Sequence, residues 1–416
     1  MLDIRANSRR SRLKNPCPSV SVRGLISRVF DIPKTMRAVV YRGPNDLRVE
    51  AVPVPRIGPN ELLVKVAVCG VCPTDIKKIH YGTVQPPRVF GHETAGTIVQ
   101  IGRQKAEGRR QKGNSALRIP HSAFRLGDRV ALHHHVPCLK CHFCRHRAFA
   151  QCPQYKRTGI TAGFEPAGGG FAEYVRVMPF VLPGVVKIPA KNSFEEGAML
   201  EPVNTVLKAV NRLNLLSGDN VLVAGQGPIG LLFTRILQLR GMKVLATDLL
   251  ETRLKLAKKF GARWTRRVAS PQSTVHSPQT TQDCGLKTVD YGLKTVDSAV
   301  IAVPSDAALA QALQLIRGGG QILLFAHTKR DSNTQHSTLN IQLSTICVDE
   351  KDLIGSYSSD FTLQPEVARL VFSRQLDVRP LITHRFPLEQ TAEAVALAVR
   401  PTPGSLKIMI QPDESK

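Results

Sequence analysis

The chain has 416 residues, of which 42% are hydrophobic, so it is long enough and apolar enough for two folded domains with sizeable cores. No apolar run approaches the length that a membrane-spanning helix needs, which excludes a helical membrane protein. The formal net charge of +25 and the isoelectric point near 10.1 would suit binding to nucleic acid or to an anionic surface.

The basic residues are clustered rather than spread over one face. Much of the excess lies in the N-terminal arm and in residues 103–125 and 263–267, and we expect all three segments to be extensions or loops. No helix-turn-helix or RNA-binding motif accompanies them. We therefore expect no membrane partner and disfavour nucleic acid as a partner.

Residues 1–35 are rich in Arg and Lys, with Ser and Pro among them and little periodicity, which predicts a disordered extension. Two interpretations are open: a faint likeness to an organellar transit peptide, or a start codon placed too early, because Met36 opens a strand-like run. From Met36 onward, β-branched runs such as residues 62–68 alternate with Pro and Gly. This pattern predicts a largely β domain.

The chain next contains a first group of residues whose side chains are common metal ligands. It contains a thiol from Cys69 or Cys72, the imidazole of His92, and the carboxylates of Glu93 and, much later, Glu201. Such a set suits a zinc ion that keeps one position open for water or substrate. Spacing alone leaves the other interpretation equally open, in which these are a buried thiol, a core histidine and surface carboxylates.

Residues 101–124 are polar, basic and without periodicity, and they lie between two strand-like runs, which predicts a surface insertion. A second cysteine group follows with C-x2-C-x2-C-x7-C spacing, at Cys138, Cys141, Cys144 and Cys152. This spacing predicts a closed, four-thiolate zinc site with a structural role. Two disulfides or free thiols are the alternatives, and they are disfavoured because no signal peptide precedes the chain and we expect a cytoplasmic protein.

The next stretch has the form of a dinucleotide-binding βαβ unit. An apolar strand at residues 221–224 and a second strand ending at Asp248 flank a glycine-rich turn and a helical run, and the turn consists of Gly225, Gln226, Gly227, Pro228, Ile229 and Gly230. The glycines admit a pyrophosphate to the backbone, and Asp248 is placed to accept hydrogen bonds from the adenosine ribose. Its carboxylate favours NAD over NADP, although Arg253 argues the other way. Further on, residues 285–290 recur as residues 292–297, which indicates a tandem duplication beside a loop.

From Met36 to the C-terminus the chain resembles the zinc-containing medium-chain dehydrogenases, the superfamily of alcohol, sorbitol and threonine dehydrogenases. The landmarks appear in that family's order: C-G-V-C-P-T-D at 69–75, G-H-E at 91–93, G-D-R-V at 127–130, the four-cysteine lobe, G-F-A-E-Y at 170–174, Glu201-Pro202 and the dinucleotide motif. The resemblance implies an α/β protein with a GroES-like β domain and a Rossmann-like, doubly wound parallel sheet. The implied bounds are 36–190 for the catalytic domain, 191–340 for the NAD-binding domain and 341–416 for a return to the catalytic domain. A homo-oligomer, dimer or tetramer, is also implied.

The family pattern selects Cys72 rather than Cys69 as the ligand, because the ligand cysteine is followed by any residue, then Ser or Thr, then Asp. It adds His92 and Glu93 to the catalytic zinc, and Glu201 directly or through a water. A Glu-Pro at Glu201 resembles the sorbitol dehydrogenase branch.

The resemblance also gives roles to the neighbours of Cys72. Thr74 matches a proton-relay hydroxyl, and Asp75 matches a carboxylate that orients the ligand imidazole. Many relatives end the relay with a histidine where this chain has Lys77, so the last proton carrier is not assigned.

The implied activity is zinc-dependent oxidation of a secondary alcohol or polyol, with hydride transferred to NAD. Threonine- or formaldehyde-dehydrogenase-like activity is an alternative. A catalytically impaired cofactor-binding homologue is a second one, motivated by the insertion and the duplication.

Overall fold

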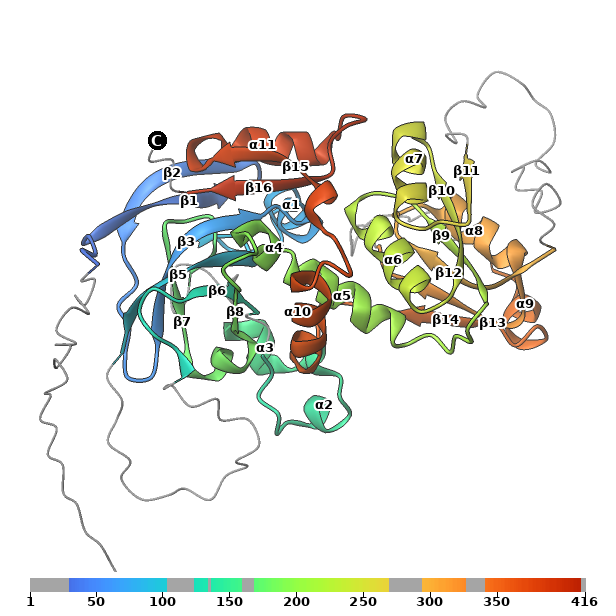
Figure 1. Cartoon of the computed structure of the whole chain (residues 1–416), viewed down its shortest axis with the longest axis horizontal. Helices are drawn as coiled ribbons and strands as arrows, with labels where there is room; N and C mark the ends of the chain where they lie inside the picture. Colours follow the sequence, from blue (N-terminus) through green and yellow to red (C-terminus); the bar gives the residue numbers. More distant parts are fainter. Residues whose placement is uncertain are drawn as a thin grey trace, which may run out of the picture. The chain divides into compact units, whose positions relative to one another are not determined.

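The computed structural model describes residues 30–102, 123–133, 136–158, 168–268, 294–326 and 341–412 (Figure 1). Most of the basic N-terminal extension and of the insertion expected at 101–124 lies outside these ranges. The first copy of the duplicated hexapeptide also lies outside them, together with the start of the second.

A six-stranded sheet forms from one continuous stretch of the chain, in the order β11-β10-β9-β12-β13-β14, and every neighbouring pair is parallel. In chain order this is 3-2-1-4-5-6, the order of doubly wound dinucleotide-binding folds. The strands are β9 (Asn220–Ala224), β10 (Lys243–Asp248), β11 (Trp264–Arg267), β12 (Val296–Ile301), β13 (Ile316–Leu324) and β14 (Asp352–Gly355). The expected doubly wound sheet is therefore present, and pairing of β14 with β13 carries it past the boundary expected near residue 340.

Both faces of this sheet are buried. Successive side chains of a strand point to opposite faces, so one strand contributes side chains to two cores. Val221 and Val223 of β9 join one core with α5 and α6, whereas Leu222 and Ala224 join a second core with α8. Helices α6 and α8 accordingly lie on opposite sides of β9 (Figure 1). The helices of this part are α5 (Leu200–Val210), α6 (Pro228–Leu239), α7 (Glu251–Lys259), α8 (Asp306–Leu315) and α9 (Leu343–Cys347).

The largely β part has a seven-stranded sheet, with the path β15-β16-β3-β5-β6-β8 and β7 paired to β3, and a three-stranded sheet β2-β1-β4. Strand β16, from the C-terminal region, pairs with β3 from the N-terminal region, and the two lie side by side in red and blue (Figure 1). The strands are β1 (Thr35–Gly43), β2 (Asp46–Pro53), β3 (Leu62–Gly70), β4 (Arg88–Val89), β5 (Glu93–Ile101), β6 (Arg129–Leu132), β7 (Tyr174–Val177), β8 (Val186–Lys187), β15 (Ile382–Pro387) and β16 (Lys407–Gln411).

Short helices connect these strands. They are α1 (Pro73–Tyr81), α2 (His142–Arg145), α3 (Pro153–Thr158), α4 (Phe194–Ala198), α10 (Gln364–Phe372) and α11 (Thr391–Val399), with 3-10 turns at Phe149–Gln151, Pro179–Gly184, Phe361–Leu363, Arg379–Leu381 and Leu388–Gln390. Among the described residues, none of the helices has the length and apolar character to cross a membrane.

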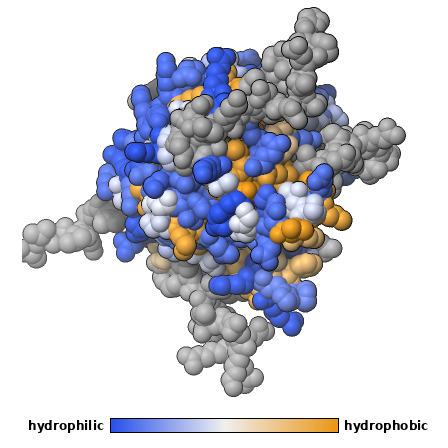
Figure 2. All heavy atoms as spheres, turned by 90° about the vertical axis from the view of Figure 1, so that its right-hand side faces the viewer, coloured by the Kyte–Doolittle hydropathy of each residue, from blue (hydrophilic) through white to orange (hydrophobic). Residues whose placement is uncertain are grey.

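One expectation about the basic segments is wrong. Residues 263–267 were expected to form a loop, but Trp264–Arg267 is strand β11 at one edge of the parallel sheet. An edge strand keeps one side in contact with solvent, so it accommodates charged residues that a central strand would exclude. The face at the right-hand side of Figure 1 is mainly hydrophilic, with apolar side chains among the polar ones (Figure 2).

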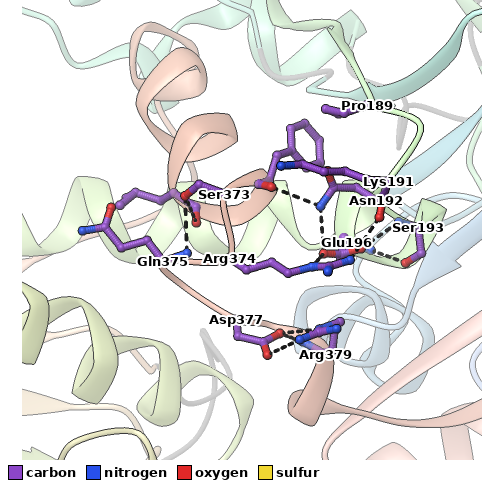
Figure 3. Close-up of polar contacts among 12 residues, drawn as sticks. Pro189, Lys191, Asn192, Ser193, Glu196, Ser373, Arg374, Gln375, Asp377 and Arg379 are labelled. Carbon is purple, nitrogen blue, oxygen red and sulfur yellow. Dashed lines mark hydrogen bonds and ion pairs between the residues drawn. The ribbon is translucent and has the colours of Figure 1, made fainter.

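An ion pair between Arg374, which follows α10, and the buried Glu196 of α4 joins these two helices (Figure 3). Glu196 is only 2% exposed, and its carboxylate accepts hydrogen bonds from the Ser193 backbone (2.7 Å), the Asn192 amide (2.9 Å) and Arg374 Nε (3.1 Å). Arg374 has a left-handed backbone (φ 61°) just after α10, and its Nη2 also donates to the Lys191 carbonyl. These contacts explain why an arginine, rather than a glycine, occupies this position.

Replacing Arg374 by alanine is expected to lower the free energy of unfolding by about 2 kcal/mol, because it leaves the buried Glu196 carboxylate without its cation. Arg379 offers a matched control, since its ion pair with Asp377 is largely exposed (52% and 36%) and its loss should change the free energy of unfolding little. Urea denaturation of both variants tests this prediction. Equal losses would show that Glu196 does not depend on Arg374.

Candidate metal and dinucleotide sites

Three of the expected catalytic ligands converge in the structure. The Sγ of Cys72, a ring nitrogen of His92 and a carboxylate oxygen of Glu93 all lie within 4.8 Å of one another. Cys72 caps the N-terminus of α1 just after β3, and Glu93 is the first residue of β5, paired with Gly70 of β3. The antiparallel β3–β5 pairing therefore brings together residues that are about twenty positions apart.

The orientation of His92 is fixed by Asp75 on α1. The Nδ1 of His92 lies 3.1 Å from Asp75 Oδ1, and both side chains are buried. Burial acts to lower the pKa of His92, but the negative charges of Asp75 and Cys72 outweigh burial and raise that pKa well above its ordinary value. With Nδ1 held by a carboxylate, Nε2 is the nitrogen available to a metal. The second oxygen of Asp75 has no hydrogen-bond partner among the described residues.

Lys407 was missed by the sequence analysis. Its Nζ forms an ion pair with Glu93 Oε2 and donates to the Val71 carbonyl at 3.0 Å, and both charged side chains are almost fully buried. Burial acts to lower the pKa of Lys407, whereas the Glu93 carboxylate raises it, and the net shift is upward. Gly70 is required here, because a Cβ on it would lie 1.9 Å from Glu93 Oε2.

Glu201 does not belong to the three-residue group. It lies in the first turn of α5, where burial raises the pKa of its carboxyl to about 7, with His92 lowering that pKa and Glu93 raising it further. These electrostatic contributions indicate that Glu201 lies near the group. A carboxyl with this pKa can hold or release a proton near neutral pH.

The remaining residues near Cys72 have distinct environments. The backbone N–H of Thr74 donates to Cys72 Sγ at 3.5 Å. Burial lowers the pKa of Lys77, which is half-buried on α1, and Cys72 opposes that shift. Burial raises the pKa of Cys69 to about 12, and its Sγ lies 3.4 Å from Thr94 Oγ1 rather than within the group of Cys72, His92 and Glu93.

The second cysteine group is compact. Cys138 Sγ and Cys141 Sγ lie 3.9 and 3.4 Å from Cys144 Sγ, and the Cys138 backbone N–H donates to Cys152 Sγ at 3.4 Å. A tetrahedron with zinc–sulfur bonds of about 2.3 Å has edges of about 3.8 Å, so the four thiols fit zinc. None of the described cysteines forms a disulfide.

The dinucleotide motif lies where the strand order reverses, between β9 and β12, at the carboxyl ends of the strands. Gly227 caps α6, Pro228 and Ile229 begin it, and a Cβ on Gly230 would lie 1.7 Å from the Gly225 carbonyl oxygen. The helix therefore packs against the turn only with glycine at position 230.

Asp248 ends β10 beside this turn. Its Oδ2 accepts the Gln226 N–H at 2.6 Å, its Oδ1 accepts the Leu250 N–H at 2.9 Å, and Arg253 Nη1 lies 3.9 Å from Oδ2. The glycine turn, the N-terminus of α6 and the acidic residue are thus arranged as a dinucleotide requires.

Comparison with known proteins agrees with this arrangement. The model of the alcohol dehydrogenase GroES-like domain matches residues 58–190, and that of the zinc-binding dehydrogenases matches residues 228–373. Sorbitol dehydrogenase of Bombyx mori is 30% identical over 382 residues, which cover 90% of this chain and 97% of that protein. The chain belongs to the zinc-containing medium-chain alcohol and polyol dehydrogenase family. It is therefore an oxidoreductase of that family, and the expected GroES-like and Rossmann-like fold is confirmed.

Solved structures show the same fold. A zinc-binding dehydrogenase from Sinorhizobium meliloti 1021, bound to NADP, has a TM-score of 0.73 at 25% identity and covers 91% of this chain and all of its own. An alcohol dehydrogenase from Escherichia coli CFT073, complexed with NADH, has a TM-score of 0.72 at 23% identity with the same coverage. The ligand roles, the domain boundaries, the homo-oligomer and the cytoplasmic location stay predictions.

Proposed function

We propose that this dehydrogenase oxidises a secondary alcohol or polyol with NAD, using zinc held by Cys72, His92 and Glu93, with Glu201 as a further ligand directly or through water. The convergence of these three ligand atoms within 4.8 Å, in a chain of this family, carries the proposal. The sorbitol dehydrogenase name of the Bombyx mori relative supports a polyol substrate. One thiolate, one imidazole and carboxylates form a donor set typical of an open zinc site.

Zinc, when bound, supplies a Lewis acid that lowers the pKa of a substrate hydroxyl. The chain contributes the rest of the chemistry. Asp75 holds His92 in the tautomer that leaves Nε2 to the metal, and Lys407 balances the charge of Glu93. The hydroxyl of Thr74 would take the substrate proton outward.

The cofactor would lie along the Gly225–Gly230 turn. The N-terminus of α6 offers unpaired N–H groups to the pyrophosphate, and Asp248 accepts hydrogen bonds from the adenosine ribose. Each carboxylate oxygen has more than one lone pair, so the existing backbone bonds to Asp248 leave room for ribose hydroxyls. Cys138, Cys141, Cys144 and Cys152 would hold the second, structural zinc.

The test combines metal analysis with reduction of NAD across a substrate panel. We expect two zinc ions per chain and NADH formation with sorbitol, xylitol or a secondary alcohol such as 2,3-butanediol. Turnover of threonine or formaldehyde alone would favour those alternative activities. Absence of turnover on every alcohol, with both zinc ions bound, would instead favour a catalytically impaired homologue.

A further inference from the structure

A pair of exposed histidines lies beside the four-cysteine group and has no part in the proposed function. His142 is the first residue of α2, and His146 follows the last residue of that helix. The His146 backbone N–H donates to the His142 carbonyl at 3.3 Å, which is the hydrogen bond that closes one α-helical turn. Side chains at the two ends of such a turn lie on the same face. The local backbone therefore brings both imidazoles together at the surface.

The two imidazole rings are close enough to share one metal ion. Their centroids lie 4.5 Å apart, with an angle of 59° between the ring planes. With metal–nitrogen bonds of about 2.1 Å, each ring centroid lies about 3.2 Å from the ion, so two rings bound at about 90° to each other are about 4.5 Å apart. The observed spacing therefore matches two neighbouring ligands in tetragonal or octahedral coordination.

Both rings are accessible to a ligand. His142 and His146 are exposed, and within the part of the chain that the structure describes neither imidazole forms a hydrogen bond or an ion pair. The His142 ring contacts the edge of the Phe143 ring, with centroids 6.0 Å apart. Neutral imidazole is the commonest side-chain ligand of metal ions. Binding an ion here would therefore replace water at the ring nitrogens and break no bond within the protein.

The surroundings select the class of ion. Residues 136–158 contain neither Asp nor Glu, so Mg²⁺ and Ca²⁺, which prefer oxygen ligands, have no carboxylate here. Imidazole nitrogen instead suits Zn²⁺, Ni²⁺ and Cu²⁺. The exposed side chains of Lys140, Arg145 and Arg147 oppose the binding of any cation, although water and salt screen their charges. These opposing effects favour an ion that is bound weakly and exchanges with solvent.

We propose that His142 and His146 form a third metal site, in which two imidazoles chelate one exchangeable Zn²⁺, Ni²⁺ or Cu²⁺ ion. The site is separate from the two proposed zinc sites, because among the described residues neither histidine belongs to the four-thiol group or to the group of Cys72. It depends only on the geometry of α2 and goes beyond the proposed function. Dialysis removes such an ion, so it adds nothing to the two zinc ions expected in the purified protein.

Calorimetric titration of the dialysed, zinc-loaded protein with Ni²⁺ at neutral pH tests the proposal. We expect one Ni²⁺ per chain, and we expect His142→Gln and His146→Gln each to weaken binding about tenfold or more, because either change removes the chelate. His80→Gln is the matched control. His80 is also an exposed helical histidine, but its Nδ1 lies 3.0 Å from Asn45 Oδ1 and no second imidazole faces it four residues away. This control should titrate like the unaltered chain, and Mg²⁺ should give no binding heat.

The stoichiometry separates a chelate from two independent imidazoles. Independent sites would take two Ni²⁺ per chain, and each single variant would lose half of that capacity at unchanged affinity, which overturns the proposal. Binding that survives in the His142→Gln/His146→Gln double variant also overturns it. The zinc content of each variant, measured in parallel, should remain that of the unaltered chain. If His142→Gln loses zinc because it adjoins Cys141, the titration of His146→Gln decides.

Discussion

Replacing Cys72 by serine is expected to remove nearly all alcohol oxidation while the protein stays folded and still binds NAD. The Cys72 Sγ is one of three candidate ligand atoms that lie within 4.8 Å of one another, and a serine hydroxyl is a far weaker zinc ligand at neutral pH. Loss of the Lewis acid should lower kcat/KM roughly a thousandfold, which corresponds to about 4 kcal/mol of transition-state stabilisation. Zinc content should fall from two ions per chain to one.

Cys69→Ser is the matched control for this prediction. Cys69 lies three residues away, is fully buried against Thr94 Oγ1, and has a thiol whose pKa is raised to about 12 by burial. We expect it to keep both zinc ions and most of the activity. Turnover that persists in Cys72→Ser, or that disappears equally in Cys69→Ser, would show that Cys72 is not the ligand.

Replacing Cys141 by serine is expected to destabilise the protein before it affects chemistry. The four thiols of the second group pack with apolar side chains such as Phe149, Tyr155 and Phe361, so a bound zinc would hold this small core together. Metal binding at a structural site contributes folding free energy, and its loss should lower the free energy of unfolding by about 4 kcal/mol.

Thermal and chemical denaturation, with and without a chelator, measure this effect. Cys347→Ser, at an exposed cysteine outside the group, should leave the stability unchanged. At a temperature where Cys141→Ser is still folded, its kcat should lie near that of the unaltered chain. A drop in kcat with unchanged stability would place the second group in the catalytic machinery instead.

The sequence predicts well those parts of the molecule whose residues lie close together along the chain. The glycine-rich turn, its flanking strands and Asp248 lie within about thirty residues, and their spacing alone implies a βαβ unit. The four-cysteine group is equally local. Cys72, His92 and Glu93 required the family's pattern as well, because residue types at these separations are also common in cores that bind no metal.

The remaining features could not be predicted, because they depend on pairing between strands that are far apart in the sequence. Lys407 reaches Glu93 only because β16 pairs with β3, and no local signal marks a buried lysine as the partner of a carboxylate in another part of the chain. Residues 263–267 were misread for a different reason. Their charge suggested a loop, whereas an edge strand tolerates such residues, and only the sheet order shows that β11 is at the edge.

The pairing of β16 with β3 also bears on the order in which the protein folds as it is synthesised. The parallel sheet comes from the continuous stretch 220–355, so it can form on a nascent chain before β16 has been translated. Until then, the end of β3 that carries Cys69 and Gly70 leaves backbone N–H and C=O groups unpaired, and Glu93 lacks its ammonium partner. We therefore expect Glu93 to gain its ammonium partner last, and the exposed edge of β3 to be the point at which stalled or truncated chains aggregate.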